Sequence, residues 1–282
     1  MSKVYFEDVV NSVENLVHAC SSLTPSCEAA LNRARKDEKN ENAEFALDVI
    51  LENNALAKRD DVPVCQDTGM AVFFVEYGQN VNFVGGDFED AINEGVRRGY
   101  KQYGYRASVL DPITRKNTGD NTPAVVHAKI VSGDDVKISF MAKGFGSENM
   151  SKLFMLTPSQ GLDGVKRAVV EAVKQAEANP CPPIVVGVGI GGTAEKAMQL
   201  AKEQLLREVG EPSKDKVLAD LEKDLLAEIN ALEIGAQGFG GNNTALAVHV
   251  AKYPTHISAL PVAVNIQCHA VRCSSVLVEG RQ

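Results

Sequence analysis

Apolar residues recur at helical spacing near the start of the chain. Those at positions 6, 9, 10, 13, 16 and 17 would lie on one face of a helix over residues 5–20. The same period returns further along the chain, between polar segments that contain many turn formers. The further helices that this pattern predicts lie at about 25–37, 41–57, 86–104, 159–178, 193–208 and 216–232.

Shorter apolar segments between these helices predict strands. Residues 70–77 form an almost unbroken apolar run, which is typical of a buried strand. The alternation of the two periods favours an α+β fold, with mixed helices and short sheets in one compact domain over residues 1–282. Residues 1–58 are expected to form its helical N-terminal part, and residues 59–282 the part that carries the chemistry. Other strands are predicted at about 123–131, 135–142, 244–252 and 259–267, with one more before the glycine run at 187–192.

Composition and charge narrow the classes of function. Hydrophobic residues make up 44% of the 282 residues, enough for a sizeable core without disulfides. The net charge of −8, without any Lys/Arg-rich run, argues against nucleic-acid binding. The N-terminal segment is acidic and amphipathic rather than a signal peptide, and no apolar run reaches the roughly 18 residues of a membrane span. We therefore expect a cytoplasmic protein with no nucleic-acid or membrane partner.

Three of the six cysteines lie where a metal centre could be bound. Cys65 precedes a DTG turn, Cys181 lies between prolines in NPCPP, and Cys268 follows a predicted strand. Three thiolates could bind a 4Fe–4S cluster and would leave its fourth iron open as a Lewis acid. Three unrelated buried cysteines would give a similar pattern, so spacing alone leaves both interpretations open.

The remaining cysteines carry a weaker indication. Six widely spaced cysteines in a cytoplasmic chain are not expected to form disulfides. Cys20 and Cys27 lie on or near predicted helices, so a structural role is expected for both. Cys273 lies five residues after Cys268, and the sequence leaves its role open.

The glycine run GVGIGG at 187–192 matches the G-x-G-x-x-G pattern and lies between a predicted strand and a predicted helix. A nicotinamide-dependent dehydrogenase is therefore one alternative, although no second parallel strand ending in an acidic residue follows. A more general interpretation is that backbone N–H groups at this helix start bind a carboxylate or a cluster sulfide.

Three polar residues are candidates for substrate chemistry. Asp67 is close to Cys65 in the sequence and could move protons. Arg106 follows a predicted helix end, and arginine is a natural bidentate partner of a carboxylate. His256 lies in a turn before the last predicted strand. Taken singly, each of these side chains is more often structural or simply exposed. The long polar stretch over 111–123 is also a candidate functional loop.

Several of these segments together resemble the N-terminal half of the class I fumarase family. This family of iron–sulfur hydro-lyases also includes tartrate dehydratase and mesaconase. The resemblance covers most of the chain, from about residue 60 to residue 275, and its motifs occur in the family order. The motifs that carry it are VCQDTGMAVFF, YRASVLDPITRKNTGDNTPAVVH, AKGFGSENMSK, NPCPPIVVGVGIGGTAEKA, LEIGAQGFGGNNTALAVHV and PTHISALPVAVNIQCHAVR.

The resemblance implies roles for particular residues. Its cluster-binding cysteines match Cys65, Cys181 and Cys268, which would bind a 4Fe–4S cluster with one open iron site. Its substrate is a small dicarboxylate, with reversible hydration of fumarate to malate as the leading reaction. The family's histidine that pairs with the aspartate of CQDTG matches His256, so Asp67 and His256 would be the acid–base pair. The family's substrate contacts match Gln66, Asp67, Arg106 and the backbone of Gly144 to Gly146.

Two departures from the family are visible. Phe145 stands in the GSEN loop where a third glycine is expected, so its side chain would alter the pocket. The family's second half, which carries further Arg and Lys contacts and a base, does not follow Gln282. A separate β subunit is therefore the expected partner, with this chain as an α subunit in a homo-oligomeric core. Arg106 is the only carboxylate clamp that the sequence suggests within the chain.

Two other classes of function remain open at this point. A nicotinamide-dependent dehydrogenase would use the GVGIGG run and would be colourless. A non-catalytic, cysteine-rich binding protein would hold a cluster without an open iron. A brown colour that bleaches in air would favour the hydro-lyase over both.

Overall fold

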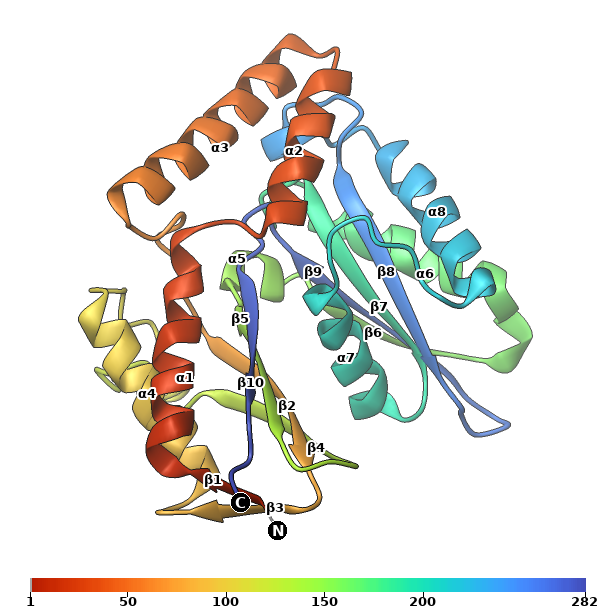
Figure 1. Cartoon of the computed structure of the whole chain (residues 1–282). Coiled ribbons are helices and arrows are strands. Elements are labelled where there is room, and N and C mark those ends of the chain that lie inside the picture. The colour runs from red at the N-terminus through yellow and green to blue at the C-terminus, as the bar shows by residue number, and fades with distance from the viewer. Residues whose placement is uncertain (1) are drawn as a thin grey trace. The chain divides into compact units, whose positions relative to one another are not determined.

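The computed structural model describes residues 2–282. They form mixed helices and sheets, which confirms the predicted α+β class. The chain folds into two compact units, each built from segments that are far apart in the sequence. Unit 1 comprises the residues up to Leu23 together with Asn54–Phe145 and Arg272–Gln282, and unit 2 comprises Thr24–Asn53 and Gly146–Val271 (Figure 1).

Unit 1 contains a mixed four-stranded sheet. Its strands are β2 (Ala71–Gly78), β4 (Val125–Val131), β5 (Val136–Ala142) and β10 (Cys273–Val278). They lie in the order β10-β5-β2-β4, where β2 is parallel to β4 and antiparallel to β5. The first five residues of β2 are buried, as its continuous apolar sequence predicts. A separate parallel pair is formed by β1 (Ser2–Tyr5) and β3 (Val81–Val84).

Two helices share the core of unit 1 with this sheet. They are α1 (Phe6–Val17) and α4 (Phe88–Gln102), which pack directly against each other. A Cβ atom at Gly95 of α4 would lie 2.6 Å from the Cβ of Val13 and 2.7 Å from the carbonyl oxygen of Val10. The close approach of the two helices therefore depends on glycine at this position. The predicted apolar face of α1 is buried at Val9, Val10, Val13, Leu16 and Val17.

Unit 2 contains a second four-stranded sheet. Its strands are β6 (Lys152–Leu156), β7 (Ile184–Gly191), β8 (Ala245–Tyr253) and β9 (Leu260–Gln267), in the order β6-β9-β7-β8. The central strand β7 is parallel to β8 and antiparallel to β9. In the β7–β9 ladder Val185 lies opposite Gln267, so the start of β7 and the end of β9 meet at the same end of the sheet.

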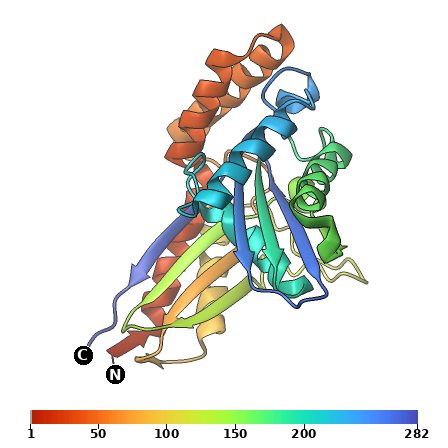
Figure 2. The same cartoon turned by 90° about the vertical axis from the view of Figure 1, so that its right-hand side faces the viewer.

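Helices cover both faces of this second sheet. The helices α6 (Gly161–Ala176) and α8 (Lys216–Asn230) share a core with β7, β8 and β9 (Figure 2). The helix α7 (Ala194–Glu203) packs on the opposite face, against glycines of β7. A Cβ at Gly187 would lie 2.0 Å from the carbonyl oxygen of Ala201, and one at Gly189 would lie 2.1 Å from that of Ala197. These two glycines are needed because the helix backbone lies directly on the strand.

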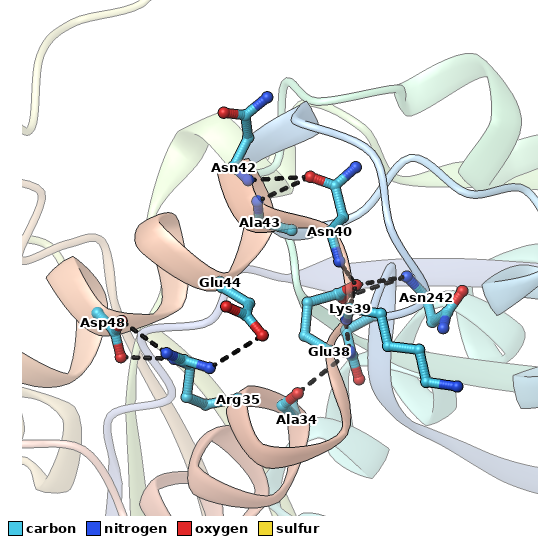
Figure 3. A network of polar contacts seen from close by, with 11 residues as sticks. Ala34, Arg35, Glu38, Lys39, Asn40, Asn42, Ala43, Glu44, Asp48 and Asn242 are labelled. Carbon is cyan, nitrogen blue, oxygen red and sulfur yellow. Dashed lines mark hydrogen bonds and ion pairs between the residues drawn. The ribbon is translucent and has the colours of Figure 1, made fainter.

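A buried carboxylate holds the connection between α2 (Pro25–Asp37) and α3 (Glu41–Asp60). Glu38 accepts hydrogen bonds from the backbone N–H of Lys39 and Asn40 and from that of Asn242, at 2.9–3.1 Å (Figure 3). The Asn243 side chain donates a further bond at 2.8 Å. Burial opposes ionisation of Glu38, but these hydrogen bonds outweigh it and lower the pKa of the carboxyl. The negative charge therefore fixes the segment around Asn242 to the α2–α3 turn.

The sequence pattern predicts helices better than strands. Every predicted helix is present, with ends within a few residues of those expected. The pattern does not predict β1, β3, β6 or β10, which are short and carry exposed or half-exposed residues.

Among residues 2–282 no helix has the length and apolar character needed to cross a membrane. Short helical turns complete the fold, namely η1 (His18–Ser21), α5 (Phe145–Glu148), η2 (Pro158–Gln160), η3 (Gln204–Leu206) and η4 (Ala236–Gly238).

A histidine on β8 is buried in its neutral form. His249 is 1% exposed, and its Nδ1–H donates to the carbonyl oxygen of Gln204 at 3.1 Å. Burial, together with the positive charge of Arg207, lowers the pKa of His249 from 6.5 to about 4. Between these two values the unfolded chain binds a proton that the folded chain does not bind.

We expect this histidine to make the protein sensitive to acid. The free energy of unfolding should fall by about 3 kcal/mol between pH 6.5 and pH 4, with no contribution from this group at higher pH. His249→Asn keeps a side-chain N–H donor but cannot be protonated, so it should remove most of this fall. Urea unfolding at a series of pH values measures the effect. Identical pH dependence in the parent and the variant would contradict the assignment.

Candidate active site

The loop before β2 carries the first group of predicted site residues. Cys65 is half-buried, and its sulfur accepts the backbone N–H of Asp67 at 3.4 Å. Gln66 is exposed, and its Oε1 lies 3.5 Å from the Cys65 sulfur. Tyr100 of α4 donates its hydroxyl to the carbonyl oxygen of Thr68 at 2.6 Å, which ties the loop to the core of unit 1. These contacts hold the loop, and with it Cys65, in a defined position beside β2.

Asp67 is held in a defined orientation. The backbone N–H of Phe145 donates to Oδ2 of Asp67 at 2.8 Å, whereas Oδ1 receives only a longer 3.5 Å contact from the Gly69 N–H. A Cβ at Gly144 would lie 3.4 Å from Asp67 Oδ2, so the glycine lets the GFGSEN loop approach the carboxylate closely. The Phe145 N–H of the predicted substrate-binding loop thus donates to Oδ2 of Asp67, and Oδ1 has only the long contact.

A buried arginine supports the same loop. Arg272 is 1% exposed, and its guanidinium donates to the carbonyl oxygen of Asp67 at 2.6 Å. A Cβ at Gly144 would also lie 3.6 Å from a guanidinium nitrogen of Arg272. No local pattern in the sequence singles out Arg272. Its position four residues after Cys268 is the one indication that the sequence offers, and a charge is rarely buried without a partner.

A cavity in unit 1 brings together two of the predicted residues. It has a volume of about 330 Å³, and Asp67 and Arg106 both line it. Phe145, the departure from the family pattern, also lines it with a side chain that is 41% exposed. Its other lining residues are Gly69, Met70, Ser108, Val109, Leu110 and Arg115. Asp67 and Arg106, two of the residues predicted to act on the substrate, therefore line one cavity.

A second arginine lines the same cavity. The sequence suggests Arg106 as the one carboxylate clamp, and the structure places Arg115 at the cavity beside it. Arg115 lies within the long polar stretch over 111–123, where the sequence gives no reason to choose it over its neighbours Lys116 or Thr114. Only the path of the loop decides which of these side chains reaches the cavity.

The other two predicted cysteine ligands lie side by side in unit 2. Cys181 precedes β7 and Cys268 follows β9, at the end of the sheet where these antiparallel strands meet. The backbone N–H of His269 donates to the carbonyl oxygen of Cys181 at 3.4 Å, and its ring Nδ1 lies 2.9 Å from the same oxygen. Residues 88 positions apart in the sequence are thus joined by direct hydrogen bonds.

The Cys181 loop has an unusual backbone that is fixed by its neighbours. Cys181 has a φ of 56°, in the left-handed region that side chains other than glycine seldom adopt. Its neighbour Pro182 accepts hydrogen bonds from the backbone N–H and the side-chain amide of Gln237, at 2.8 and 2.7 Å. Strain of this kind persists where the surroundings over-determine it, which is common at functional sites. Cys181 is accordingly exposed rather than buried in the core.

His256 and the glycine run lie at the other end of this sheet. His256 precedes β9, Gly191 is the last residue of β7, and Gly192 follows it. Cys181 and Cys268 lie at the opposite ends of these two strands. Eight residues of strand separate the two ends by roughly 26 Å. The structure therefore does not bring His256 together with the cysteines of its own unit. The end of the glycine run is thus about one strand length away from Cys181 and Cys268, and the expectation that it binds a carboxylate or a cluster sulfide stays a prediction.

The cysteines predicted to be structural are buried. Cys20 and Cys27 are both 0% exposed, and burial raises the pKa of each thiol to about 12. A thiol that resists ionisation so strongly is a poor metal ligand. Cys273 begins β10 and is half-buried, opposite Met141 of β5. The difference in burial separates Cys65, Cys181 and Cys268 from Cys20 and Cys27.

The sequence was compared with models of known protein families. The model described as fumarate hydratase (fumerase) matches residues 10–276, nearly the whole chain. The chain belongs to the fumarate hydratase family. Because this family catalyses the addition or removal of water, the chain is a hydro-lyase.

The chain is also similar to individual proteins that are named as subunits of a dehydratase. A protein of Methanocaldococcus jannaschii, provisionally named L(+)-tartrate dehydratase subunit alpha, is 44% identical over 271 residues, which is 94% of each chain. The L(+)-tartrate dehydratase subunit alpha of Escherichia coli O157:H7 is 33% identical over 222 residues, covering 77% of this chain and 73% of its own. The corresponding protein of Escherichia coli strain K12 gives the same identity and coverage.

Membership of the fumarate hydratase family bears on the nicotinamide alternative. In a dinucleotide site the glycines let a pyrophosphate approach a helix start. Here Gly187 and Gly189 lie within β7 and are covered by the backbone of α7, so no pyrophosphate could contact them. The G-x-G-x-x-G match reflects helix–strand packing rather than nucleotide binding.

Proposed function

We propose that this fumarate hydratase family member hydrates fumarate to malate reversibly, as the cluster-binding α subunit of an iron–sulfur hydro-lyase. The observation that carries the proposal is the unit 1 cavity, where Asp67 and Arg106 face the same space. A dicarboxylate needs a cation for its carboxylate and a proton-transfer group near its reacting carbons. Family membership over residues 10–276 supports water addition as the reaction.

The chain's own residues would bind the substrate and move one proton. The Arg106 guanidinium would bind a substrate carboxylate by paired hydrogen bonds. Asp67 would use Oδ1 to take a proton from water during hydration and return it to the leaving water during dehydration. The Phe145 N–H, which holds Oδ2, would keep the carboxylate in this orientation. Gln66, Gly144 and Gly146 would complete the substrate contacts.

We propose that Cys65, Cys181 and Cys268 bind a 4Fe–4S cluster with one open iron site. The donor set fits such a group, because the Cys181 and Cys268 segments are hydrogen-bonded together and the Cys65 sulfur accepts a backbone N–H. Among residues 2–282 no group of three His, Cys, Asp or Glu side chains is gathered closely enough to hold a single metal ion. When bound, the cluster would supply a Lewis acid at the substrate hydroxyl.

A separate β subunit is proposed as the partner of this chain. The Escherichia coli relatives are named as alpha subunits, which supports a divided enzyme. The partner would supply the group that exchanges the carbon-bound proton, because Asp67 serves the oxygen side of the reaction. His256, which lies far from Cys181 and Cys268 within unit 2, is proposed only as a tuning residue for Asp67. A homo-oligomeric α core in the cytoplasm completes the proposal.

L(+)-tartrate is the second candidate substrate. The relatives at 44% and 33% identity are both named for tartrate dehydratase, which favours it. Tartrate carries one more hydroxyl group than malate, so a pocket built to hydrogen-bond that hydroxyl would discriminate strongly between them.

The experiment that tests the function is an anaerobic assay of the reconstituted chain together with its candidate β subunit. Malate, L(+)-tartrate and mesaconate would be offered to the same preparation, and kcat/KM would be compared. Turnover of malate above that of tartrate and mesaconate is the expected result. A higher kcat/KM for tartrate would select the second candidate, and no turnover of any of the three would refute both candidate substrates.

A further inference from the structure

The loop that carries Cys181 has few hydrogen-bond donors of its own. Three of the five residues in NPCPP are prolines, which have no N–H group to donate. The N–H of Cys181 donates to the carbonyl oxygen of Ala178 at 3.0 Å, and the φ of Cys181 is 56°. Side chains other than glycine seldom adopt this left-handed conformation. The surroundings of the loop must therefore impose it on the cysteine.

Two residues from distant segments supply the donors that the loop lacks. The carbonyl oxygen of Cys181 accepts the backbone N–H of His269 at 3.4 Å and lies 2.9 Å from the ring Nδ1 of the same residue. The next carbonyl oxygen, that of Pro182, accepts the backbone N–H and the side-chain amide of Gln237, at 2.8 and 2.7 Å. Two consecutive carbonyl groups are thus each held by one main-chain donor and one side-chain donor.

These contacts define the tautomer of the His269 ring. A carbonyl oxygen can only accept a hydrogen bond, so Nδ1 carries the hydrogen that points to Cys181. The amide nitrogen of Gln237 lies 3.2 Å from the same Nδ1, but it is itself a donor and its N–H is used by Pro182. The ring of His269 is therefore a donor of fixed direction, and it needs no charge for this role.

The turn that carries Gln237 packs directly on the Cys181 loop. Gln237 has a φ of 52° within the short turn η4. A Cβ at Gly238 would lie 2.5 Å from the Cβ of Ala178, the residue just before NPCPP, so the turn and the loop approach closely. His269 and Gln237 also line a cavity of about 580 Å³. The space beside the two side chains allows either of them to be replaced without overpacking.

We propose that His269 and Gln237 are positioning residues of the cluster site. They hold Cys181 in its left-handed conformation and so set the direction of its sulfur relative to that of Cys268. The inference rests on the proposed role of the two cysteines as cluster ligands. Because His269 directly follows Cys268 in the sequence, one residue joins the two ligand segments through its main chain and its ring. Replacement of residues that orient metal ligands lowers metal affinity about 10- to 100-fold.

Release of iron from the reconstituted full chain tests the proposal without turnover. Under argon, bathophenanthroline would be added as a ferrous chelator, and the loss of the cluster absorbance would be followed with time. His269→Leu should lose its cluster about 10- to 100-fold faster than the parent, because the ring donor to the Cys181 carbonyl is gone. His269→Asn should recover most of the parental retention, because the asparagine amide places an N–H donor close to the position of Nδ1.

Gln237 provides a graded second test. Gln237→Leu keeps the main-chain N–H to Pro182 and should therefore accelerate iron release less than His269→Leu does. Gln237→Glu should accelerate it more than Gln237→Leu, because a carboxylate oxygen beside the Pro182 carbonyl leaves two acceptors without a hydrogen between them. Gln175→Leu removes an exposed amide on α6, and as the matched control it should release iron at the parental rate.

A measurement on the apo chain examines the hydrogen bond itself. NMR of the ring nitrogens in the isotope-labelled apo chain should show the hydrogen of His269 on Nδ1, with His269→Asn identifying the signal. A hydrogen on Nε2 instead would overturn the inference. Parental iron release in His269→Leu would also overturn it. The same holds if His269→Asn retains iron no better than His269→Leu, since the effect would then be one of packing.

The possible results separate this inference from the proposed function. A parent chain that takes up no cluster, or a cluster that persists in Cys181→Ser, would overturn the ligand assignment and this inference with it. Loss of the cluster in Cys181→Ser together with parental iron release in His269→Leu would overturn this inference alone. The expected release rates without turnover of any candidate substrate would leave the inference standing and refute the proposed substrates.

Discussion

Cys65→Ser, Cys181→Ser and Cys268→Ser should each abolish cluster loading after anaerobic reconstitution. Iron is retained by soft thiolate ligands, and a serine hydroxyl does not replace one at neutral pH. The three side chains are at least partly accessible, and the Cys65 sulfur already accepts a backbone N–H. Iron and sulfide analysis, together with the visible absorbance of the protein, measures the loss directly and does not depend on activity.

The other cysteines provide the controls for this experiment. Cys20→Ser and Cys27→Ser should keep the cluster, because both thiols are buried and their pKa values are raised to about 12. If the serine is poorly tolerated in the core, Cys20→Ala and Cys27→Ala keep the test valid. Cys273→Ser is the decisive comparison, because Cys273 lies near Cys268 in the sequence. Loss of the cluster in Cys273→Ser with retention in Cys268→Ser would refute the ligand assignment.

Asp67→Asn should lower kcat by roughly two to four orders of magnitude while leaving the cluster content unchanged. The asparagine side chain still offers an oxygen to the Phe145 N–H, so the loop geometry is preserved. What disappears is the ability to accept and return a proton through the second carboxylate oxygen. The loss should appear mainly in kcat, because the proposed mechanism assigns the substrate carboxylate to Arg106 and the proton transfer to Asp67.

An exposed aspartate of the same unit serves as the matched control. Asp90→Asn on α4 makes the same chemical change at the surface and should leave turnover at the parental level. Arg106→Gln should act mainly on KM, which separates binding from proton transfer. Near-parental kcat in Asp67→Asn at full cluster content would remove this carboxylate from the mechanism.

The elements that the sequence predicts correctly are those in which a local pattern of apolar residues directly reflects burial. The apolar stripe of α1 is buried at the positions expected, because helical periodicity leaves one face to the core. The continuous apolar run of β2 likewise forms a buried central strand. In contrast, β10 at the sheet edge begins with Cys-Ser-Ser, lacks a regular apolar–polar alternation and is partly exposed, so nothing local distinguishes it from a loop.

Parts of the site depend on distant contacts that no local pattern encodes. The adjacency of Cys181 and Cys268 follows from the pairing of β7 with β9, which the sequence alone could not specify. No sequence pattern points to Arg272 or Arg115, because only the path of the backbone places Arg272 in the core and Arg115 at the cavity. The glycine run had the opposite problem, since its pattern fits nucleotide binding and helix packing equally well until the position of α7 is known.

The register of β7 against β9 sets the relative positions of Cys181, which precedes β7, and Cys268, which follows β9. Deleting one residue from either strand would shift the register and move one sulfur along the sheet by about 3.3 Å, a displacement that a cluster ligand does not tolerate. The connection over residues 254–259, at the far end of the ladder, does not set this spacing. Insertions there should therefore leave the positions of the two sulfurs unchanged but displace His256, the proposed tuning residue for Asp67, whereas the lengths of the two strands should stay invariant.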